Sequence, residues 1–175
     1  MTFDRQAEFE ALRATIRERG SVRMCAILGG LALWGAILVA VLAARLDSFV
    51  TLVPLLVLAA AFEVSFFMHT GVERIGRYLQ VFYEEADTAR GWETIAMGYG
   101  AKFPGGLDPL FGTLFGAAAL VSLLATLNTG APWPGWRALT FFAHAAFGYR
   151  IFAARKAAAG QRALDLERYR ALCSK

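Results

Sequence analysis

Four long apolar runs decide what this chain can fold into. They extend over residues 24–44, 49–68, 109–127 and 136–152, and each approaches the roughly 20 residues with which an α-helix crosses about 30 Å of hydrocarbon. Of the 175 residues, 57% are hydrophobic and only 18% are charged, which is too apolar for a soluble domain of this length. We therefore predict an all-α, polytopic membrane protein with four transmembrane helices.

The basic residues indicate how the chain crosses the membrane. Of the 18 Lys and Arg residues, only Arg45 and Arg137 lie beside the connections that follow the first and third runs. Cytoplasmic loops carry an excess of Lys and Arg, so we expect both termini in the cytoplasm and a multi-pass protein of the cell membrane, of the bacterial inner-membrane type. Because a polar segment precedes the first run, we expect an uncleaved anchor and no signal peptide.

These features divide the chain into alternating membrane and cytosolic segments. The predicted segments are an N-terminal cytosolic or interfacial helix (1–22), transmembrane helices 1 and 2 (23–69), a cytosolic extension with an interfacial part (70–106), transmembrane helices 3 and 4 (107–154) and a C-terminal cytosolic helix (155–175). The polar segments should form a cytosolic layer of amphipathic helices. Acidic and basic residues are mixed in this layer, so the net charge of +4 does not suggest a nucleic-acid-binding face.

The second apolar run carries a carboxylate and continues into a charged helix. On a 3.6-residue helix, Thr70, Arg74 and Arg77 lie on the same side as Glu63, so this carboxylate continues the polar face of the extension. The opposite side has apolar residues at 72, 75, 79 and 82, which is the spacing of a short coiled coil. Gly71 leaves a kink in this helix as an alternative.

A polar layer is predicted inside the apolar runs. At 1.5 Å per residue from each cytosolic boundary, Glu63 and His144 reach similar depths. Four glycines that permit close helix packing lie in the same layer, namely Gly29, Gly30, Gly112 and Gly116. A charge in hydrocarbon costs at least about 2.5 to 3.5 kcal/mol, so Glu63 should face the bundle interior, a water-filled cavity or a subunit interface. We expect it to face His144; the alternative is a neutral Glu63 that only fixes packing.

The other polar and aromatic residues suggest further roles. His69 and His144 raise the possibility of haem ligation, but their predicted depths differ too much for one porphyrin, so we expect no cofactor and no metal. Trp92 and Tyr99 recur at helical spacing, which is typical of a helix in the plane of the membrane interface. Trp133 and Trp136 should be interface anchors on the outer side. Cys25 and Cys173 are expected as free thiols.

The function prediction rests on Glu63. We expect a small oligomeric channel or transporter, lined or gated by Glu63 together with His144, His69 and Thr70. Its cytosolic mouth, or the contacts to a partner, would come from Glu73, Arg74, Arg77, Glu84 and Glu85. The alternative is a non-catalytic scaffold or accessory subunit that binds a partner through its cytosolic helices.

An enzyme is not expected, because the chain has no GxSxG, P-loop, HExxH or CxxC motif. In either reading the partners are the lipid bilayer and further protein chains, as a homo-oligomer or a larger membrane complex. Four short spans bury little surface between them, which favours such assembly.

Overall fold

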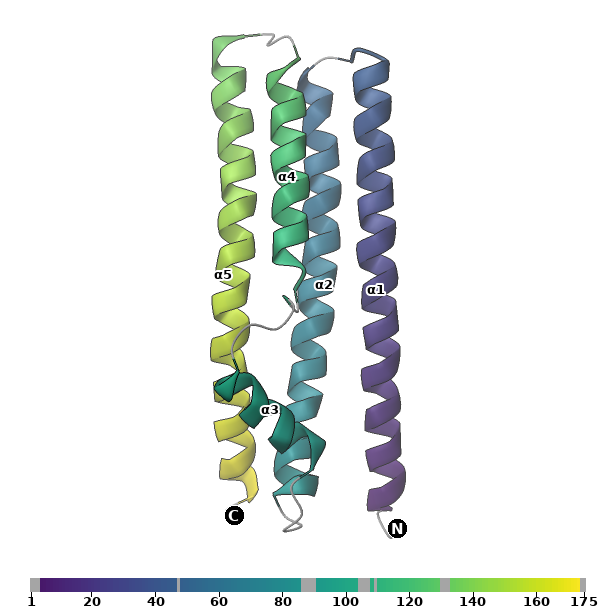
Figure 1. Ribbon diagram of the computed structural model, residues 1–175, viewed down its shortest axis with the longest axis vertical. Coiled ribbons are helices and arrows are strands. Elements are labelled where there is room, and N and C mark those ends of the chain that lie inside the picture. The colour runs from purple at the N-terminus through teal and green to yellow at the C-terminus, as the bar shows by residue number, and fades with distance from the viewer. Residues whose placement is uncertain are drawn as a thin grey trace. The chain divides into compact units, whose positions relative to one another are not determined.

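The protein is all-α, as predicted (Figure 1). The computed structural model describes residues 4–46, 48–85, 91–103, 108, 110–129 and 133–173. The elements in chain order are α1 (Arg5–Ala43), the 3₁₀ turn η1 (Ser48–Thr51), α2 (Leu52–Leu79), the π-helical turn η2 (Gln80–Glu84), α3 (Trp92–Lys102), α4 (Gly112–Leu127) and α5 (Pro134–Cys173).

Within the part of the chain that the structure describes, two helices are long and apolar enough to cross a membrane. They are α1 and the helix Leu52–Glu84 that α2 forms with η2, whereas α4 is a shorter apolar helix. Such helices are a weak indication of membrane association by themselves, because a core helix or a signal sequence can have the same length and composition. This observation does not establish the four transmembrane helices that the sequence predicts.

Helix ends follow the local sequence. The Asp4 carboxylate accepts the backbone N–H groups of Gln6 and Ala7 at 3.0 and 3.3 Å, which caps the start of α1. The carboxylate of Asp108 accepts the backbone N–H groups of Leu110 and Thr113 at 3.1 and 3.0 Å. Asp108 therefore caps the start of α4.

Three helices run through boundaries at which the sequence suggested a change of segment. Helix α1 joins the predicted N-terminal helix to the first apolar run, and α5 joins the fourth run to the C-terminal helix. Helix α2 continues through Gly71 to Leu79, so the helix has no break at Gly71. The change of geometry comes later, at η2, where the N–H of Glu85 donates to the carbonyl of Gln80 at 2.8 Å. A π turn shifts the helical register, so the 72, 75, 79, 82 spacing does not continue as a regular heptad.

The chain packs as two compact units. Unit 1 consists of Met1–Val22, Phe67–Leu107 and Lys156–Lys175, and unit 2 of Arg23–Phe66 and Asp108–Arg155. In unit 2, the centre of the core is Phe62 of α2, whose ring lies 5.4 Å from that of Phe115 in α4 and 6.0 Å from that of Phe147 in α5. Phe62 and Phe115 are fully buried. Edge-on aromatic packing of this kind holds three helices of unit 2 together.

Unit 1 combines an aromatic cluster with many polar contacts. Tyr78 of α2 stacks on Phe82 of η2 with ring centroids 4.6 Å apart, and Tyr169 of α5 packs edge-on against Tyr78 at 5.6 Å. Both Tyr78 and Tyr83 donate to the Glu8 carboxylate of α1. The start of α1 and the end of α5 are thereby joined to the same part of α2 and η2.

Candidate functional site

A buried arginine forms the centre of a polar cluster in unit 1. The Arg77 side chain is only 4% exposed, lies 3.3 Å from a carboxylate oxygen of Glu93 in α3, and donates to the side-chain oxygen of Gln80 at 2.5 Å. Glu93 also pairs with Arg13 of α1 at 3.2 Å. Burial raises the pKa of Glu93 above its usual range, although the charges of Arg77 and Arg13 act in the opposite direction. Three helices of unit 1 therefore meet at one partly desolvated ion-pair network.

A second carboxylate caps α3 from outside the helix. The Glu84 carboxylate of η2 accepts the backbone N–H groups of Glu93 and Thr94 at 2.8 and 2.7 Å, and the Thr94 hydroxyl at 2.8 Å. The local N-cap residue, Gly91, has no side chain with which to cap the helix. A Cβ at Gly91 would lie 2.2 Å from the Glu84 side chain, so a larger residue there would displace the Glu84 carboxylate from its present position. The π turn thus aims Glu84 at the first turn of α3.

We expect Glu84→Ala to loosen α3 at its start. Loss of an N-cap costs about 1 to 2 kcal/mol, and the variant also removes a negative charge that favours the positive end of the helix dipole. Amide hydrogen exchange of Glu93 and Thr94 should therefore become about 10-fold faster. Glu10→Ala is the control, because the Glu10 side chain is bonded to Gln6 within α1. Equal exchange rates at α3 in both variants would contradict the capping role.

Helix α3 turns its polar side toward this network and its apolar side outward. Four apolar or aromatic residues of α3 and its C-cap are 54–68% exposed, namely Trp92, Ile95, Tyr99 and Phe103. The Lys102 ammonium lies 5.5 Å from the centre of the Phe103 ring. This orientation is the inverse of a helix on the surface of a soluble domain. The four residues are called the outer face of α3 below.

Of the residues predicted as a mouth or partner contacts, Glu84 caps α3 and the others form ion pairs within unit 1. Three of these residues pair with side chains of α5. Arg162 lies 2.7 Å from Glu73, Asp165 lies 3.3 Å from Arg74 and Arg170 lies 2.6 Å from Glu85. The hydrogen bonds from Arg170 lower the pKa of Glu85. A ladder of complementary charges therefore joins the last part of α5 to α2 and the residue after η2.

In unit 2, Glu63 does not meet His144. Its two carboxylate oxygens lie 2.7 Å from Nε and 2.7 Å from Nη2 of Arg150 in α5, a two-point ion pair. The Arg150 guanidinium also lies 4.8 Å from the centre of the Phe66 ring. The Glu63 side chain is 48% exposed and that of Arg150 is 39% exposed. The predicted contact between Glu63 and His144 is wrong, because the Glu63 carboxylate is bound by Arg150 instead.

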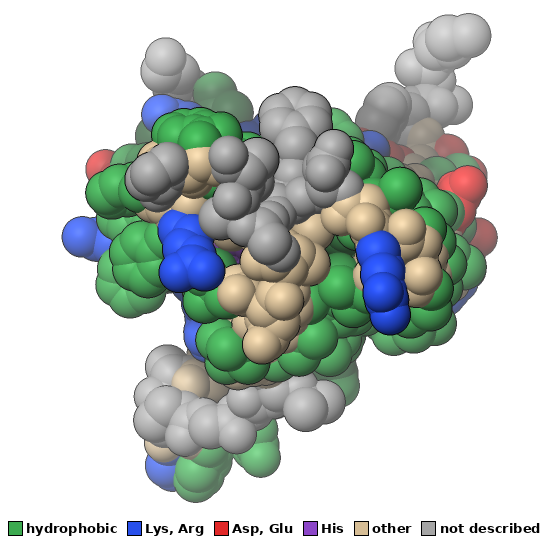
Figure 2. Space-filling view, turned by 90° about the horizontal axis from the view of Figure 1, so that it is seen from above, with side chains coloured by type: hydrophobic (Ala, Val, Ile, Leu, Met, Phe, Trp, Pro, Cys, Tyr) green, Lys and Arg blue, Asp and Glu red, His purple; other side chains and the backbone are tan. Residues whose placement is uncertain are grey.

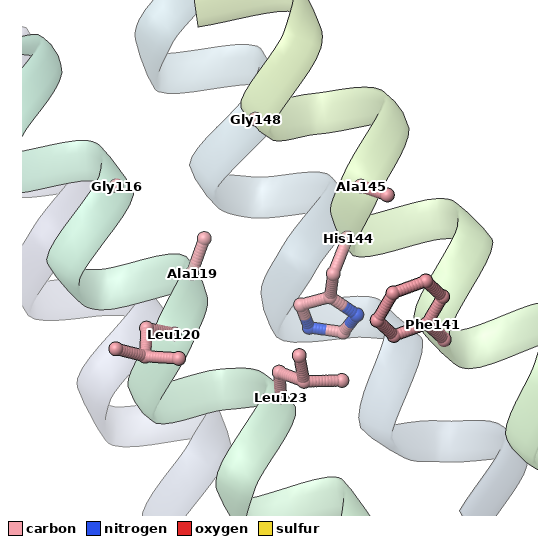
Figure 3. A pocket seen from close by; sticks show the side chains of 8 residues that line it. All are labelled: Gly116, Ala119, Leu120, Leu123, Phe141, His144, Ala145 and Gly148. Carbon is pink, nitrogen blue, oxygen red and sulfur yellow. The ribbon is translucent and has the colours of Figure 1, made fainter.

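His144 makes a contact within its own helix. Its Nδ1 lies 2.8 Å from the carbonyl oxygen of Thr140, and Nε2 has no hydrogen-bond partner. The side chain lines an apolar groove of about 310 Å³ between α4 and α5 (Figure 3). Gly116 lines the same groove. His144 is the one polar side chain among the residues that line it.

His69 and Thr70 of α2, which were predicted to line the channel with Glu63, belong to unit 1. His69 is buried, and the Thr70 hydroxyl donates to the Phe67 carbonyl at 3.1 Å. His69 and His144 belong to different units. Among the described residues, no group of three or more His, Cys, Asp and Glu side chains could hold a metal ion.

The predicted packing glycines and tryptophan anchors have different environments. A Cβ on Gly30 would lie 2.4 Å from the Ala61 Cβ of α2, and one on Gly112 would lie 2.9 Å from the Asp108 carboxylate. Gly29 and Gly116 have nothing within 4 Å of such a Cβ. Trp133 is exposed and Trp136 is buried. The face seen in Figure 2, which looks down on the upper end of Figure 1, shows mainly hydrophobic side chains and few Lys and Arg among the coloured residues.

Comparison with known proteins adds no assignment. No family model, no curated protein and no solved structure matches this chain.

Proposed function

We propose that this chain is a non-catalytic integral membrane protein, a scaffold or accessory subunit that works inside a larger membrane assembly. In this proposal the four apolar runs span the membrane and both termini are cytoplasmic, so unit 2 lies in the bilayer and unit 1 on its cytosolic side. Several large apolar side chains of unit 2 are strongly exposed, among them Leu56, Phe142 and Phe152 at 68% each. Lipid-facing residues of a membrane bundle have this character.

The outer face of α3 supports the same placement. Trp and Tyr prefer the level of the lipid headgroups, and an in-plane helix keeps its apolar face toward the acyl chains. The ion pairs of Glu93 hold the polar side of α3 against α1 and α2. Unit 1 would then lie on the membrane surface through α3 and present its remaining polar helices to the cytosol.

The half-exposed ion pair between Glu63 and Arg150 carries the proposal of an assembly. Both residues are on helices that the proposal places in the membrane, and about half of the Glu63 side chain and two fifths of that of Arg150 are uncovered. Exposing such a pair to lipid is unfavourable, because charged side chains inside membranes face protein or water. Another protein surface, from a second copy or a different subunit, would cover the pair and remove this cost.

The same pair does not favour transport. A carboxylate that gates or conducts must exchange its proton or ion, whereas Glu63 is held by both of its oxygens against one guanidinium. The channel or transporter reading stays a prediction, and proton or ion flux in proteoliposomes tests it. Flux that is lost in Glu63→Gln would overturn the scaffold proposal.

A double substitution tests the role of the pair in assembly. Glu63→Gln combined with Arg150→Gln keeps hydrogen-bonding groups and removes both charges. We expect near-normal thermal unfolding in detergent, and at least about 10-fold weaker association in nanodiscs, measured by native mass spectrometry and by co-purification of the partner. The 10-fold estimate corresponds to about 1.4 kcal/mol of lost interaction across the interface.

Arg137→Gln is the control, because it removes a charge of unit 2 near the start of α5, outside the Glu63–Arg150 pair, and should leave association unchanged. Recovery of the wild-type chain as a strict monomer without any partner, in nanodiscs of native lipids, would contradict the proposal. So would equal association of the double variant and the wild type.

A further inference from the structure

An apolar groove between α4 and α5 has no role in the proposed assembly. It measures about 310 Å³, at the low end of the range for small-molecule sites. Its lining residues are Gly116, Ala119, Leu120, Leu123, Phe141, His144, Ala145 and Gly148. Neither Gly116 nor Gly148 has an atom within 4 Å of an added Cβ, so their missing side chains help to leave the groove open.

The hydrogen bond of His144 determines what its ring offers. A carbonyl oxygen only accepts, so Nδ1, which lies 2.8 Å from the Thr140 carbonyl, must carry a proton. An unpaired positive charge among these apolar side chains would be unfavourable, so the ring is neutral. Nε2 is then a bare lone pair, which can accept a hydrogen bond but cannot donate one.

Nε2 is a buried acceptor without a partner, and the residue is only 6% exposed. Buried polar atoms in proteins are nearly always hydrogen-bonded, and each exception asks for an explanation. Figure 3 shows the ring extending from α5 into the groove, toward Leu123 of α4. The imidazole ring therefore lies where a molecule bound in the groove would meet it.

We propose that this groove binds an apolar molecule with a single hydroxyl group, such as a long-chain membrane alcohol, whose O–H donates to Nε2 of His144. The apolar lining suits one hydrocarbon chain or ring and excludes charged headgroups, and an acceptor nitrogen excludes anions. A helix, about 10 Å across, is too wide to enter a groove of this volume as a whole. The proposal stands independently of the assembly proposed above, because neither Glu63 nor Arg150 lines the groove.

Histidine nitrogen NMR tests the contact directly. The chain has two histidines, so a ¹⁵N-histidine-labelled protein in nanodiscs gives few signals, and the signals that His144→Phe removes belong to His144. Dodecanol should move the Nε2 resonance of His144 in a saturable way. Dodecane, which has the same chain without the hydroxyl, should leave that resonance in place.

Binding of tritiated dodecanol to the full-length protein tests the site. His144→Phe should bind about 3- to 10-fold more weakly, since it removes one hydrogen bond from an apolar site. Gly116→Leu should abolish saturable binding by filling the groove while His144 remains. Gly35→Leu is the matched control, because a Cβ on Gly35 also meets nothing within 4 Å and Gly35 does not line the groove.

Three results would overturn the proposal. One is no movement of the Nε2 resonance at saturating dodecanol, and another is equal movement in Gly116→Leu and Gly35→Leu. The third is cross-linking of the groove to a second copy of the chain that dodecanol does not reduce, which would show that protein covers this surface. Loss of assembly in the Glu63 and Arg150 double variant has no bearing on these readouts.

Discussion

Arg77→Met is expected to destabilise the packing of α3 in unit 1 by about 3 kcal/mol. Removing one member of a buried ion pair costs about 3 to 5 kcal/mol, because the other charge stays desolvated. The lower end applies here, since Glu93 would keep its contact with Arg13 at 3.2 Å. Met retains much of the length and apolar volume of the arginine side chain, so the loss reflects the missing charge and hydrogen bonds more than a cavity.

Hydrogen exchange measures this loss locally. Amides of α3 that open by release from the network should exchange about 100-fold faster, which corresponds to about 3 kcal/mol. Arg74→Met is the matched control on the same helix, because the Arg74 side chain is 57% exposed and pairs with Asp165 at 3.3 Å. A surface pair of that kind contributes about 0 to 1 kcal/mol. If both variants changed α3 exchange equally, the burial of Arg77 would have no energetic consequence.

The deficit of Arg77→Met should depend on pH through Glu93. The pKa of Glu93 in the folded protein is raised by burial, above the value near 4.3 expected for an unfolded chain. A raised carboxyl pKa contributes stability that is present below the unfolded pKa and is lost as pH rises through the folded pKa. Because Arg77 opposes this shift, the variant should have a still higher Glu93 pKa, and its deficit should be smallest at about pH 4 and grow toward neutral pH.

The all-α class could be predicted from the apolar runs, because runs of that length without strand-like alternation favour helices. The continuity of the helices could not be predicted in the same way. Gly71 costs roughly 1 kcal/mol relative to Ala, and the sequence does not show what that glycine contacts. In unit 1 the Arg19 guanidinium occupies the space beside Gly71, 2.6 Å from where a Cβ would be. A glycine that suggested a break is thus a place where another side chain packs.

The position of Glu63 along its helix could be estimated, but its partner could not. Depth depends only on the rise per residue, whereas a contact between α2 and α5 depends on how both helices are rotated about their axes and on side-chain reach. Arg150 was grouped with the cytosolic cations by the sequence pattern, yet its long side chain extends to the Glu63 carboxylate. His144 bonds to Thr140 one turn earlier in its own helix, a local option that the prediction of a Glu63 contact left out.

The sequence contains even fewer features that could have predicted the network around Arg77. Gln80 and Glu93 are ordinary polar residues in sequence, and Glu93 lies in a segment whose aromatic residues drew attention to the opposite face. The π turn at Gln80–Glu84 has no marker such as Pro or a glycine pair within it. It is this turn that directs Glu84 at the backbone of α3, so the network could be recognised only with the geometry known.

Gly30→Leu is expected to destabilise unit 2 by about 3 kcal/mol. A Cβ on Gly30 would lie 2.4 Å from the Ala61 Cβ and 3.7 Å from the Ala61 Cα, so α1 and α2 would have to separate. Overpacking of a tight contact costs typically about 1 to 3 kcal/mol. The upper end is expected, because the atoms that Leu would meet are a Cβ and backbone, which cannot move aside by rotating a side chain.

The neighbouring glycine provides the matched control. Gly29 is exposed, and a Cβ there meets nothing within 4 Å, so Gly29→Leu should be neutral or should stabilise α1 by up to about 1 kcal/mol through better helix propensity. The free energy of unfolding is measured by denaturation with sodium dodecyl sulfate in mixed micelles. It should fall in Gly30→Leu, and it should stay the same or rise in Gly29→Leu. Equal losses at the two positions would mean that helix insertion or lipid contact, and not the approach of α1 to Ala61, sets the requirement for glycine.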